Sequence, residues 1–235
     1  MHRAIGILFA AALLYANPAA TRQLVDLELV LAVDISSSVS TEEFNLQMGG
    51  LANAFRDPLA AAASRASGDL GIAVSLIQWS DNRRQFLAVD WDLLHDVASS
   101  RHFADQIAAA PRLVVAGGGT AIGGALKYGT AQIESNDYDG LRLVIDVSGD
   151  GRTNQGWPDR PLRDATVARG ITINGLVILN EEPLLDDYYH ANVIGGAGAF
   201  VMTTMDFHSF ASAILAKLIR EIAGAPVASL EETMP

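Results

Sequence analysis

The sequence predicts an α/β domain built on a doubly wound, mostly parallel six-stranded sheet, with helices on both faces and one antiparallel edge strand. An uninterrupted apolar run at residues 29–33, and a run at residues 143–147 that only Asp146 interrupts, are typical of strands buried on both faces, as in parallel sheets. Segments with strand and helix patterns alternate along the chain, which favours a doubly wound arrangement. No internal repeat and no linker interrupts this alternation, so we expect one domain.

In the first half, the first strand covers residues 26–33. Ser40-Thr41-Glu42-Glu43 fits a capping box with Ser40 at the N-cap, and it opens a helix that runs towards residue 63 and is interrupted at residues 56–58. A strand at residues 71–79, a turn at Asp81-Asn82 and a return strand at residues 84–89 predict a hairpin at the sheet edge.

In the second half, helical and strand patterns continue to alternate. Helices are expected at residues 93–110, 121–134, 163–169 and 207–223, and strands at residues 141–147, 171–179 and 199–205. A glycine-rich loop at residues 116–120 precedes the second of these helices. Residues 181–189 are acidic and aromatic, and we expect them to form a surface loop or a short helix.

Composition narrows the function. Of 235 residues, 50% are hydrophobic and 18% are charged, which indicates a folded chain with a full core. The formal net charge of -11 argues against nucleic acid or an anionic membrane as the main partner, because phosphate binding needs clustered Lys and Arg. The chain has no cysteine, which excludes disulfides and thiolate metal sites.

The first 20 residues predict a secretory signal peptide. His2 and Arg3 precede a short apolar segment at residues 4–16, and small residues follow it. An uncleaved anchor or a core helix is the alternative. The predicted organisation is a signal peptide at residues 1–20, a domain at residues 25–224 and a flexible tail at residues 225–235. We therefore expect a bacterial periplasmic or secreted protein with no membrane span after signal removal.

Oxygen-bearing side chains follow three predicted elements. Asp34, Ser36 and Ser38 end the first strand, Thr120 closes the glycine-rich loop, and Asp150 follows the strand at residues 141–147. In an open parallel sheet, ligands bind outside the carboxyl ends of the strands. Carboxylate and hydroxyl oxygens suit a hard cation, Mg²⁺ first, with Mn²⁺ or Ca²⁺ as alternatives. The competing interpretation is that Asp34 and the serines only cap the next helix.

These three segments, in this order, resemble the metal-ion-dependent adhesion site of the von Willebrand factor A domain family: Asp34-x-Ser36-x-Ser38, Gly118-Gly119-Thr120 and Asp150-Gly151. The resemblance covers about residues 27–223. The sequence around Asp150 (residues 144–151), together with residues 188–196, is similar to a bacterial branch of exported A-type proteins labelled only as a domain of unknown function (DUF1194-like).

The resemblance implies a role for each residue. The hydroxyls of Ser36, Ser38 and Thr120 would hold the cation, some directly and some through water, while Asp34 and Asp150 would balance its charge. A partner protein's Glu or Asp would fill the open position. Two positions of the sequence, Gly149 and Asp146, do not fit this motif.

One is a departure: A-type domains usually carry Thr or Ser directly before the Asp-Gly, where this chain has Gly149. The other is Asp146, a carboxylate inside an apolar strand and too far from its tip for direct ligation. We expect Asp146 to be a paired structural acid, bonded to Arg142 or to a backbone amide.

The expected function is a cation-dependent binding module and not an enzyme. The alternative is a metal-assisted hydrolase at the same site, for which His190 or His208 could approach in space. Plausible partner-binding rim residues, or simply solvated loop residues, are Asp81, Asn82, Arg152, Asn154 and Trp157.

Known enzyme motifs fit less well. A haloacid dehalogenase phosphatase needs a second Asp where Ser36 stands, and a P-loop needs Lys-Ser or Lys-Thr where residues 123–125 are Gly-Gly-Ala. A Rossmann dinucleotide site needs glycines where residues 35–38 are Ile-Ser-Ser-Ser, and no Gly-x-Ser-x-Gly elbow occurs.

Overall fold

A computed structural model of the chain describes residues 21–57, 68–113 and 118–223. The predicted signal peptide, the predicted tail and part of the glycine-rich loop lie outside these residues. Within them, no helix is both long enough and apolar enough to cross a membrane.

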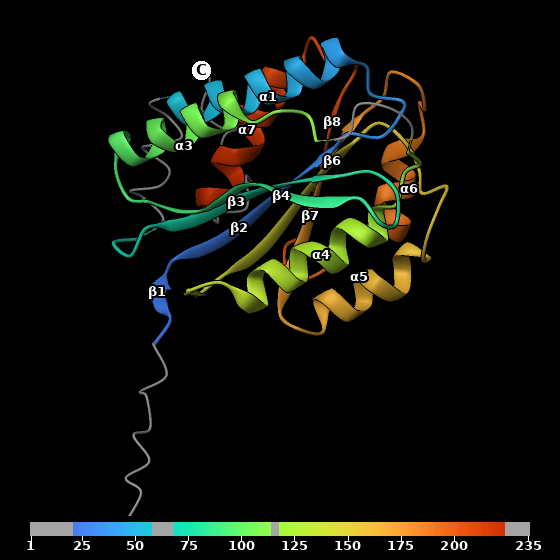
Figure 1. Cartoon of the computed structure of the whole chain (residues 1–235). Helices are drawn as coiled ribbons and strands as arrows, with labels where there is room; N and C mark the ends of the chain where they lie inside the picture. The colour runs from blue at the N-terminus through green and yellow to red at the C-terminus, as the bar shows by residue number, and fades with distance from the viewer. Residues whose placement is uncertain (1–20, 58–67, 114–117, 224–235) are drawn as a thin grey trace, which may run out of the picture.

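Six strands form one central sheet in the order β4-β3-β2-β6-β7-β8. The pairs are parallel except β3–β4, which places β4 as an antiparallel edge strand. This confirms the predicted fold class (Figure 1). The strands are β2 (Leu27–Asp34), β3 (Ile72–Trp79), β4 (Gln85–Leu94), β6 (Leu143–Gly149), β7 (Ile171–Ile178) and β8 (Val201–Thr204).

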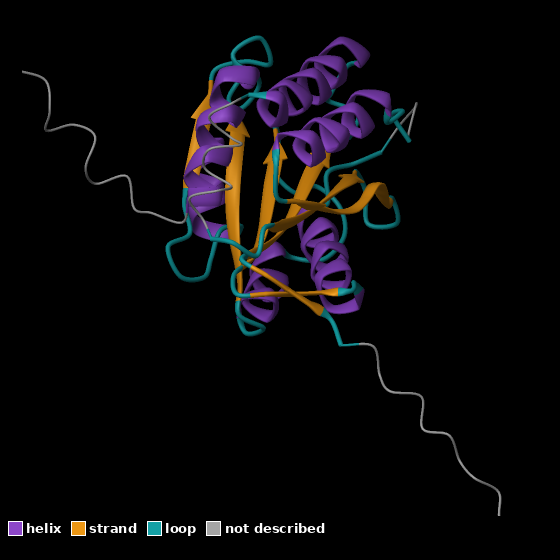
Figure 2. Ribbon diagram, turned by 90° about the vertical axis from the view of Figure 1, so that its left-hand side faces the viewer, coloured by secondary structure: helices purple, strands orange, loops and turns teal. Residues whose placement is uncertain are grey.

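Helices cover both faces of the sheet (Figures 1 and 2). The helices of the first face are α1 (Thr41–Arg56), α3 (Val97–Ala109) and α7 (Phe210–Ala223), and those of the second are α4 (Ile122–Ser135), α5 (Asp159–Val167) and α6 (Leu185–Asn192). Strand β2 explains this arrangement, because its successive side chains point to opposite faces. Leu29 and Leu31 belong to the core under α1, whereas Val30 and Ala32 belong to the core under α4.

Capping side chains mark the starts of α1 and α3. The predicted capping box opens α1, because Ser40 accepts from the backbone N–H of Glu43 while the Glu43 side chain accepts from the backbone N–H of Ser40. Strand β4 is longer than predicted and ends at Leu94, so α3 begins four residues later than expected, behind its own N-cap Asp96.

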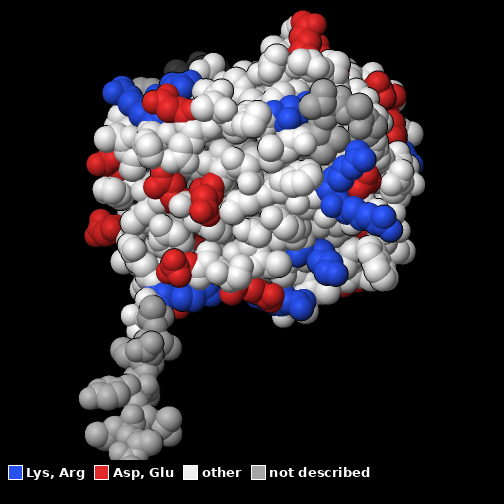
Figure 3. Space-filling view, in the orientation of Figure 1, with Lys and Arg blue, Asp and Glu red and all other residues white. Residues whose placement is uncertain are grey.

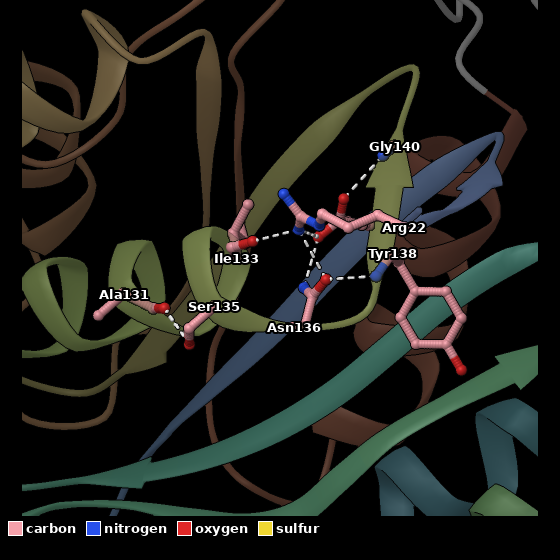
Figure 4. A network of polar contacts seen from close by, with 8 residues as sticks. Arg22, Ala131, Ile133, Ser135, Asn136, Tyr138 and Gly140 are labelled. Carbon is pink, nitrogen blue, oxygen red and sulfur yellow. Dashed lines mark hydrogen bonds and ion pairs between the residues drawn. The ribbon is translucent and has the colours of Figure 1, made fainter. Parts of the chain in front are cut away.

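A second, two-stranded sheet at the amino end of the molecule was not predicted. It pairs β1 (Gln23–Val25) with β5 (Tyr138–Gly140) in parallel. Buried Glu28 anchors it, accepting from Asn136 Nδ2 at 2.6 Å and from the backbone N–H of Gly140 at 2.7 Å. Arg22 donates to Asn136 Oδ1 and to a carbonyl of α4 (Figure 4). This network fastens the first described residues to the sheet.

Asp146 is a paired structural acid, but its partner is not the expected Arg142. The buried ammonium group of Lys217 on α7 contacts Asp146 Oδ1 and lies 2.7 Å from Glu221 Oε1. Arg142 donates instead to the backbone carbonyls of Glu221 and Ile222. Together these contacts fix α7 to β6, and they lie away from the carboxyl ends of the strands.

Charged side chains are unevenly spread over the surface. On the face shown in Figure 3, several acidic side chains lie in the left half of the view and a group of basic side chains lies in the right half, although each half also carries charges of the other sign. On this face, acidic and basic side chains are therefore mixed, with no continuous patch of one sign.

Candidate metal centre

The structure brings the three predicted oxygen-bearing segments to one edge of the sheet. Strands β2 and β6 are parallel neighbours, with Val33 opposite Ser148, so Asp34 and Asp150 leave the sheet side by side. Residues 118–120 join them because the backbone N–H of Ser37 donates to the Gly118 carbonyl at 3.3 Å. The carboxyl ends of the parallel strands β2 and β6 therefore meet here, and residues 118–120 pack against them.

A chain of hydrogen bonds connects four of the five predicted ligands. The backbone N–H of Ser36 donates to Asp34 Oδ1 at 2.7 Å. The hydroxyls of Ser36 and Ser38 lie 3.0 Å apart, and Ser38 donates to Asp150 Oδ1 at 2.8 Å. The alternation Asp-x-Ser-x-Ser therefore turns these side chains towards a common point, while Ser37 between them is exposed.

Thr120, the fifth residue, is buried at the same place. A Cβ built on Gly151 would lie 3.9 Å from Thr120 Oγ1, which puts this hydroxyl next to the residue that follows Asp150. Gly118 has a φ of +128°, and a side chain there would collide with Ser80, so the loop needs a glycine at this position.

The two carboxylates are unusual in being buried and incompletely bonded. Asp34 and Asp150 are 0% and 1% exposed, and Oδ2 of each has no hydrogen-bond partner among the described residues. Burial, with the charge of Asp150 nearby, raises the pKa of Asp34 to about 8. Burial likewise raises the pKa of Asp150 to about 6, although the hydrogen bond from Ser38 opposes the shift. A cation beside them would counteract both shifts, because a neighbouring positive charge favours the ionised form of each carboxylate.

The donor set fits a hard divalent cation. It offers two carboxylate oxygens that need a partner and three hydroxyls, and no nitrogen or sulfur. No group of three or more His, Asp or Glu among the described residues could hold a metal, so binding here would depend on the hydroxyls. The simple capping interpretation is wrong, because the N-cap of α1 is Ser40.

Arg112 supports the predicted metal loop, residues 34–39 at the end of β2, a role that the sequence does not reveal. Its Nη2 donates to the carbonyls of Ile35, Ser36 and Val39 at 2.7 to 3.1 Å, and its guanidinium lies over the ring of Phe44. A single arginine thus fixes the backbone that carries the two serines predicted as ligands. An arginine far along the chain gives no local signal of such a target.

The predicted rim residues have mixed surroundings. Asp81 forms an ion pair with Arg84, and Arg152 forms one with Glu182, at 3.3 Å and 2.7 Å respectively. Asn154 is exposed, and its Oδ1 accepts from the backbone N–H of Thr120, so it positions a predicted ligand.

The other two rim residues lie on the same loops. Asn82 is exposed and approaches Gly156 of the loop after β6. Trp157 is 64% exposed and lines a groove of about 350 Å³ between α4 and α5.

Tyr189 was expected on a surface segment but is fully buried against the site. Helix α6 places the Tyr189 ring at the carboxyl ends of the central strands. A Cβ built on Gly149 there would lie 2.8 Å from Tyr189 Oη and 3.1 Å from Asp34 Oδ2. Burial, together with the charges of Asp34 and Asp150, raises the pKa of Tyr189 well above its usual value. His190 and His208, the histidines named for a hydrolase, are both exposed.

Solved structures define the class of fold. Proximal thread matrix protein 1 from the mussel byssus, in a form with a zinc-occupied MIDAS motif, has a TM-score of 0.60 at 16% identity over 86% of this chain and 49% of its own. The pilus adhesin SpaC from Lactobacillus rhamnosus GG has a TM-score of 0.59 at 12% identity, over 86% of this chain and 31% of its own.

A von Willebrand factor type A structure from Catenulispora acidiphila gives 0.55 at 14% identity, over 84% of this chain and 43% of its own. The chain spans about half the length of the mussel proteins it matches. Its fold is that of a von Willebrand factor A domain.

Within this fold class, the sequence assigns the family. The chain belongs to the family described as "Protein of unknown function (DUF1194)", whose model matches residues 23–226. No curated protein matches the sequence.

Proposed function

We propose that this chain is an exported A-type binding module that engages a partner protein through a divalent cation, Mg²⁺ first among the candidates. The observation that carries the proposal is the pair of buried carboxylate oxygens, Asp34 Oδ2 and Asp150 Oδ2, that have no partner among the described residues. Leaving such atoms unpaired costs free energy, and a bound ion between the two carboxylates is one way to relieve that cost.

Each residue has a defined part in the proposal. Ser36, Ser38 and Thr120 supply hydroxyl oxygens, and Asp34 and Asp150 balance the charge of the cation. When bound, the cation supplies an open coordination position for an Asp or Glu of the partner. The rest of the proposed organisation is a signal peptide at residues 1–20, the domain at residues 25–224 and a tail at residues 225–235, in a periplasmic or secreted protein.

Two neighbours in fold support this proposal. The description of one records a zinc-occupied MIDAS motif, and that of the other names a pilus adhesin. At identities of 16% and 12% they support the module type only, and the residues above carry the argument for the site.

Calorimetric titration of Mg²⁺, Mn²⁺ and Ca²⁺ into metal-stripped protein tests the site. We expect saturable one-site binding that is lost in Asp34→Ala and weakened at least about tenfold in Ser38→Ala. Ser37→Ala is the matched control, because this exposed serine lies between the two ligand serines and should bind like wild type. Unchanged binding in Asp34→Ala would remove the site from the proposal.

A peptide-display selection tests the partner half. Protein loaded with Mg²⁺ and protein treated with EDTA are each exposed to the same random peptide library. We expect enrichment of peptides with Asp or Glu on the loaded protein alone. Equal enrichment on both samples would mean that recognition does not use the cation.

A further inference from the structure

Two unsatisfied polar atoms meet beside Gly149. A Cβ built on this glycine would lie 2.8 Å from the phenolic oxygen of Tyr189 and 3.1 Å from Asp34 Oδ2. Neither oxygen has a hydrogen-bond partner among the described residues, and both residues are 0% exposed. The absence of a side chain at position 149 thus leaves room for a phenol next to the carboxylate of a proposed ligand.

The fold makes room for this ring from two strands. Gly175 on β7 lies opposite Val147 on β6, two residues before Gly149, and a Cβ on Gly175 would lie 2.8 Å from Tyr189 Cδ1. The ring therefore lies over glycines of neighbouring strands, and its hydroxyl reaches the sheet edge. Helix α6 delivers it there, with Leu185 buried one turn earlier on the same face.

A purely structural role explains the ring but not the hydroxyl. A buried phenol without a partner costs about 1–3 kcal/mol relative to a satisfied one, and phenylalanine would fill the same space without that cost. The hydroxyl lies where it can serve as a donor beside the Asp34 carboxylate.

We infer that Tyr189 is a positioning residue of the metal centre, whose hydroxyl donates to the Asp34 carboxylate when a cation is bound. This inference rests on the proposed function. The phenol of α6 would then do the work of a hydroxyl side chain at position 149, holding the carboxylate in orientation and in its charged form. It also explains why a glycine can stand at that position.

The test exchanges the hydroxyl between the two positions. Tyr189→Phe should bind Mn²⁺ roughly 10–100-fold more weakly than wild type, the usual effect of removing a group that orients a ligand. Its stability in EDTA should equal or exceed that of wild type, because an unpartnered hydroxyl has been removed. Adding Gly149→Ser to Tyr189→Phe should restore much of the affinity, since the phenolic oxygen no longer occupies the space of the new side chain.

Gly149→Ala in the same Tyr189→Phe background is the matched control, because it fills the space without a hydroxyl, and it should not restore affinity. Rescue by serine alone supports the inference. Wild-type affinity in Tyr189→Phe overturns it, as does equal rescue by serine and alanine. If wild type itself binds no Mn²⁺, Mg²⁺ or Ca²⁺, the proposed function fails first, and the two failures are thereby distinguished.

Discussion

The metal-free protein should lose stability as the pH rises, because its site contains a buried carboxylate that resists ionisation. Asp34 has a pKa of about 8 in the folded state and an ordinary value of 3.8 when exposed. Between these values the native state holds a proton that the unfolded state has released. The free energy of unfolding therefore falls as the pH rises from 3.8, and the fall ends above about 8.

The size of the effect follows from the width of this window. One unit of difference in pKa corresponds to about 1.4 kcal/mol, so the contribution of Asp34 should fall by roughly 3 kcal/mol between pH 5 and pH 7. Asp34→Asn removes the ionisation and keeps an oxygen to accept from the backbone N–H of Ser36. In EDTA, the variant should gain stability over wild type by about 1.4 kcal/mol for each pH unit in this range.

Urea denaturation in EDTA at a series of pH values measures the difference. A saturating Mg²⁺ concentration should then stabilise wild type, by about 2.7 kcal/mol at one hundred times the dissociation constant, and leave Asp34→Asn unchanged. Asp146→Asn is the matched control, because burial also raises the pKa of Asp146 to about 8 although it lies outside the site. It should flatten the pH profile and keep the response to Mg²⁺.

Parallel pH profiles for wild type and Asp34→Asn would refute the reasoning. They would mean that Asp34 ionises in the folded protein as readily as in water, so that the site carries no stored electrostatic cost. A response to Mg²⁺ in Asp34→Asn as large as that of wild type would separate metal binding from this carboxylate.

Three further outcomes are expected. Lys217→Met should lower the free energy of unfolding by about 3–5 kcal/mol in urea denaturation, because it leaves the buried carboxyl pair of Asp146 and Glu221 without its cation; a loss below about 1 kcal/mol would show that Lys217 does not stabilise this pair. Arg112→Met should weaken Mn²⁺ binding measured by calorimetry, because three carbonyls of the metal loop lose their donor; wild-type affinity would make Arg112 a support of the fold alone. Ser40→Ala should cost about 1 kcal/mol of thermal stability as α1 loses its cap, with metal affinity unchanged, and a loss of binding would contradict the separation of cap and site.

Features that depend on a short local pattern of residues could be predicted from the sequence. The central strands appear as apolar runs because both of their faces are covered, and the start of α1 is visible in Ser40 and Glu43. The set of oxygen-bearing residues could also be predicted, because the carboxyl ends of parallel strands converge whatever their loops contain. What these signals share is that each depends on neighbouring residues in the sequence or on topology alone.

The missed features depend on contacts between distant segments. Strands β1 and β5 have three residues each, too few to show a periodicity. The acidic residues before Tyr189 indicate a surface segment. The space for the buried ring comes from Gly149 and Gly175 on two strands, which only the fold brings next to it. The same limit applies to Arg112, whose three acceptors belong to a loop more than seventy residues earlier.

The departure at Gly149 connects these points. A Ser or Thr at position 149 would be recognised from the sequence, because it would belong to the motif. A phenol that reaches the same point from α6 can be recognised only in the folded structure. If a metal site needs a donor beside Asp34, selection can supply it from any element that reaches the same point, and a glycine is then required to leave room for it. Burial raises the pKa of Asp34, and a hydrogen bond from the Tyr189 hydroxyl would lower it again. Both groups lie beside Gly149. The position that departs from the expected motif is therefore where the chemistry of this site is most open to experiment.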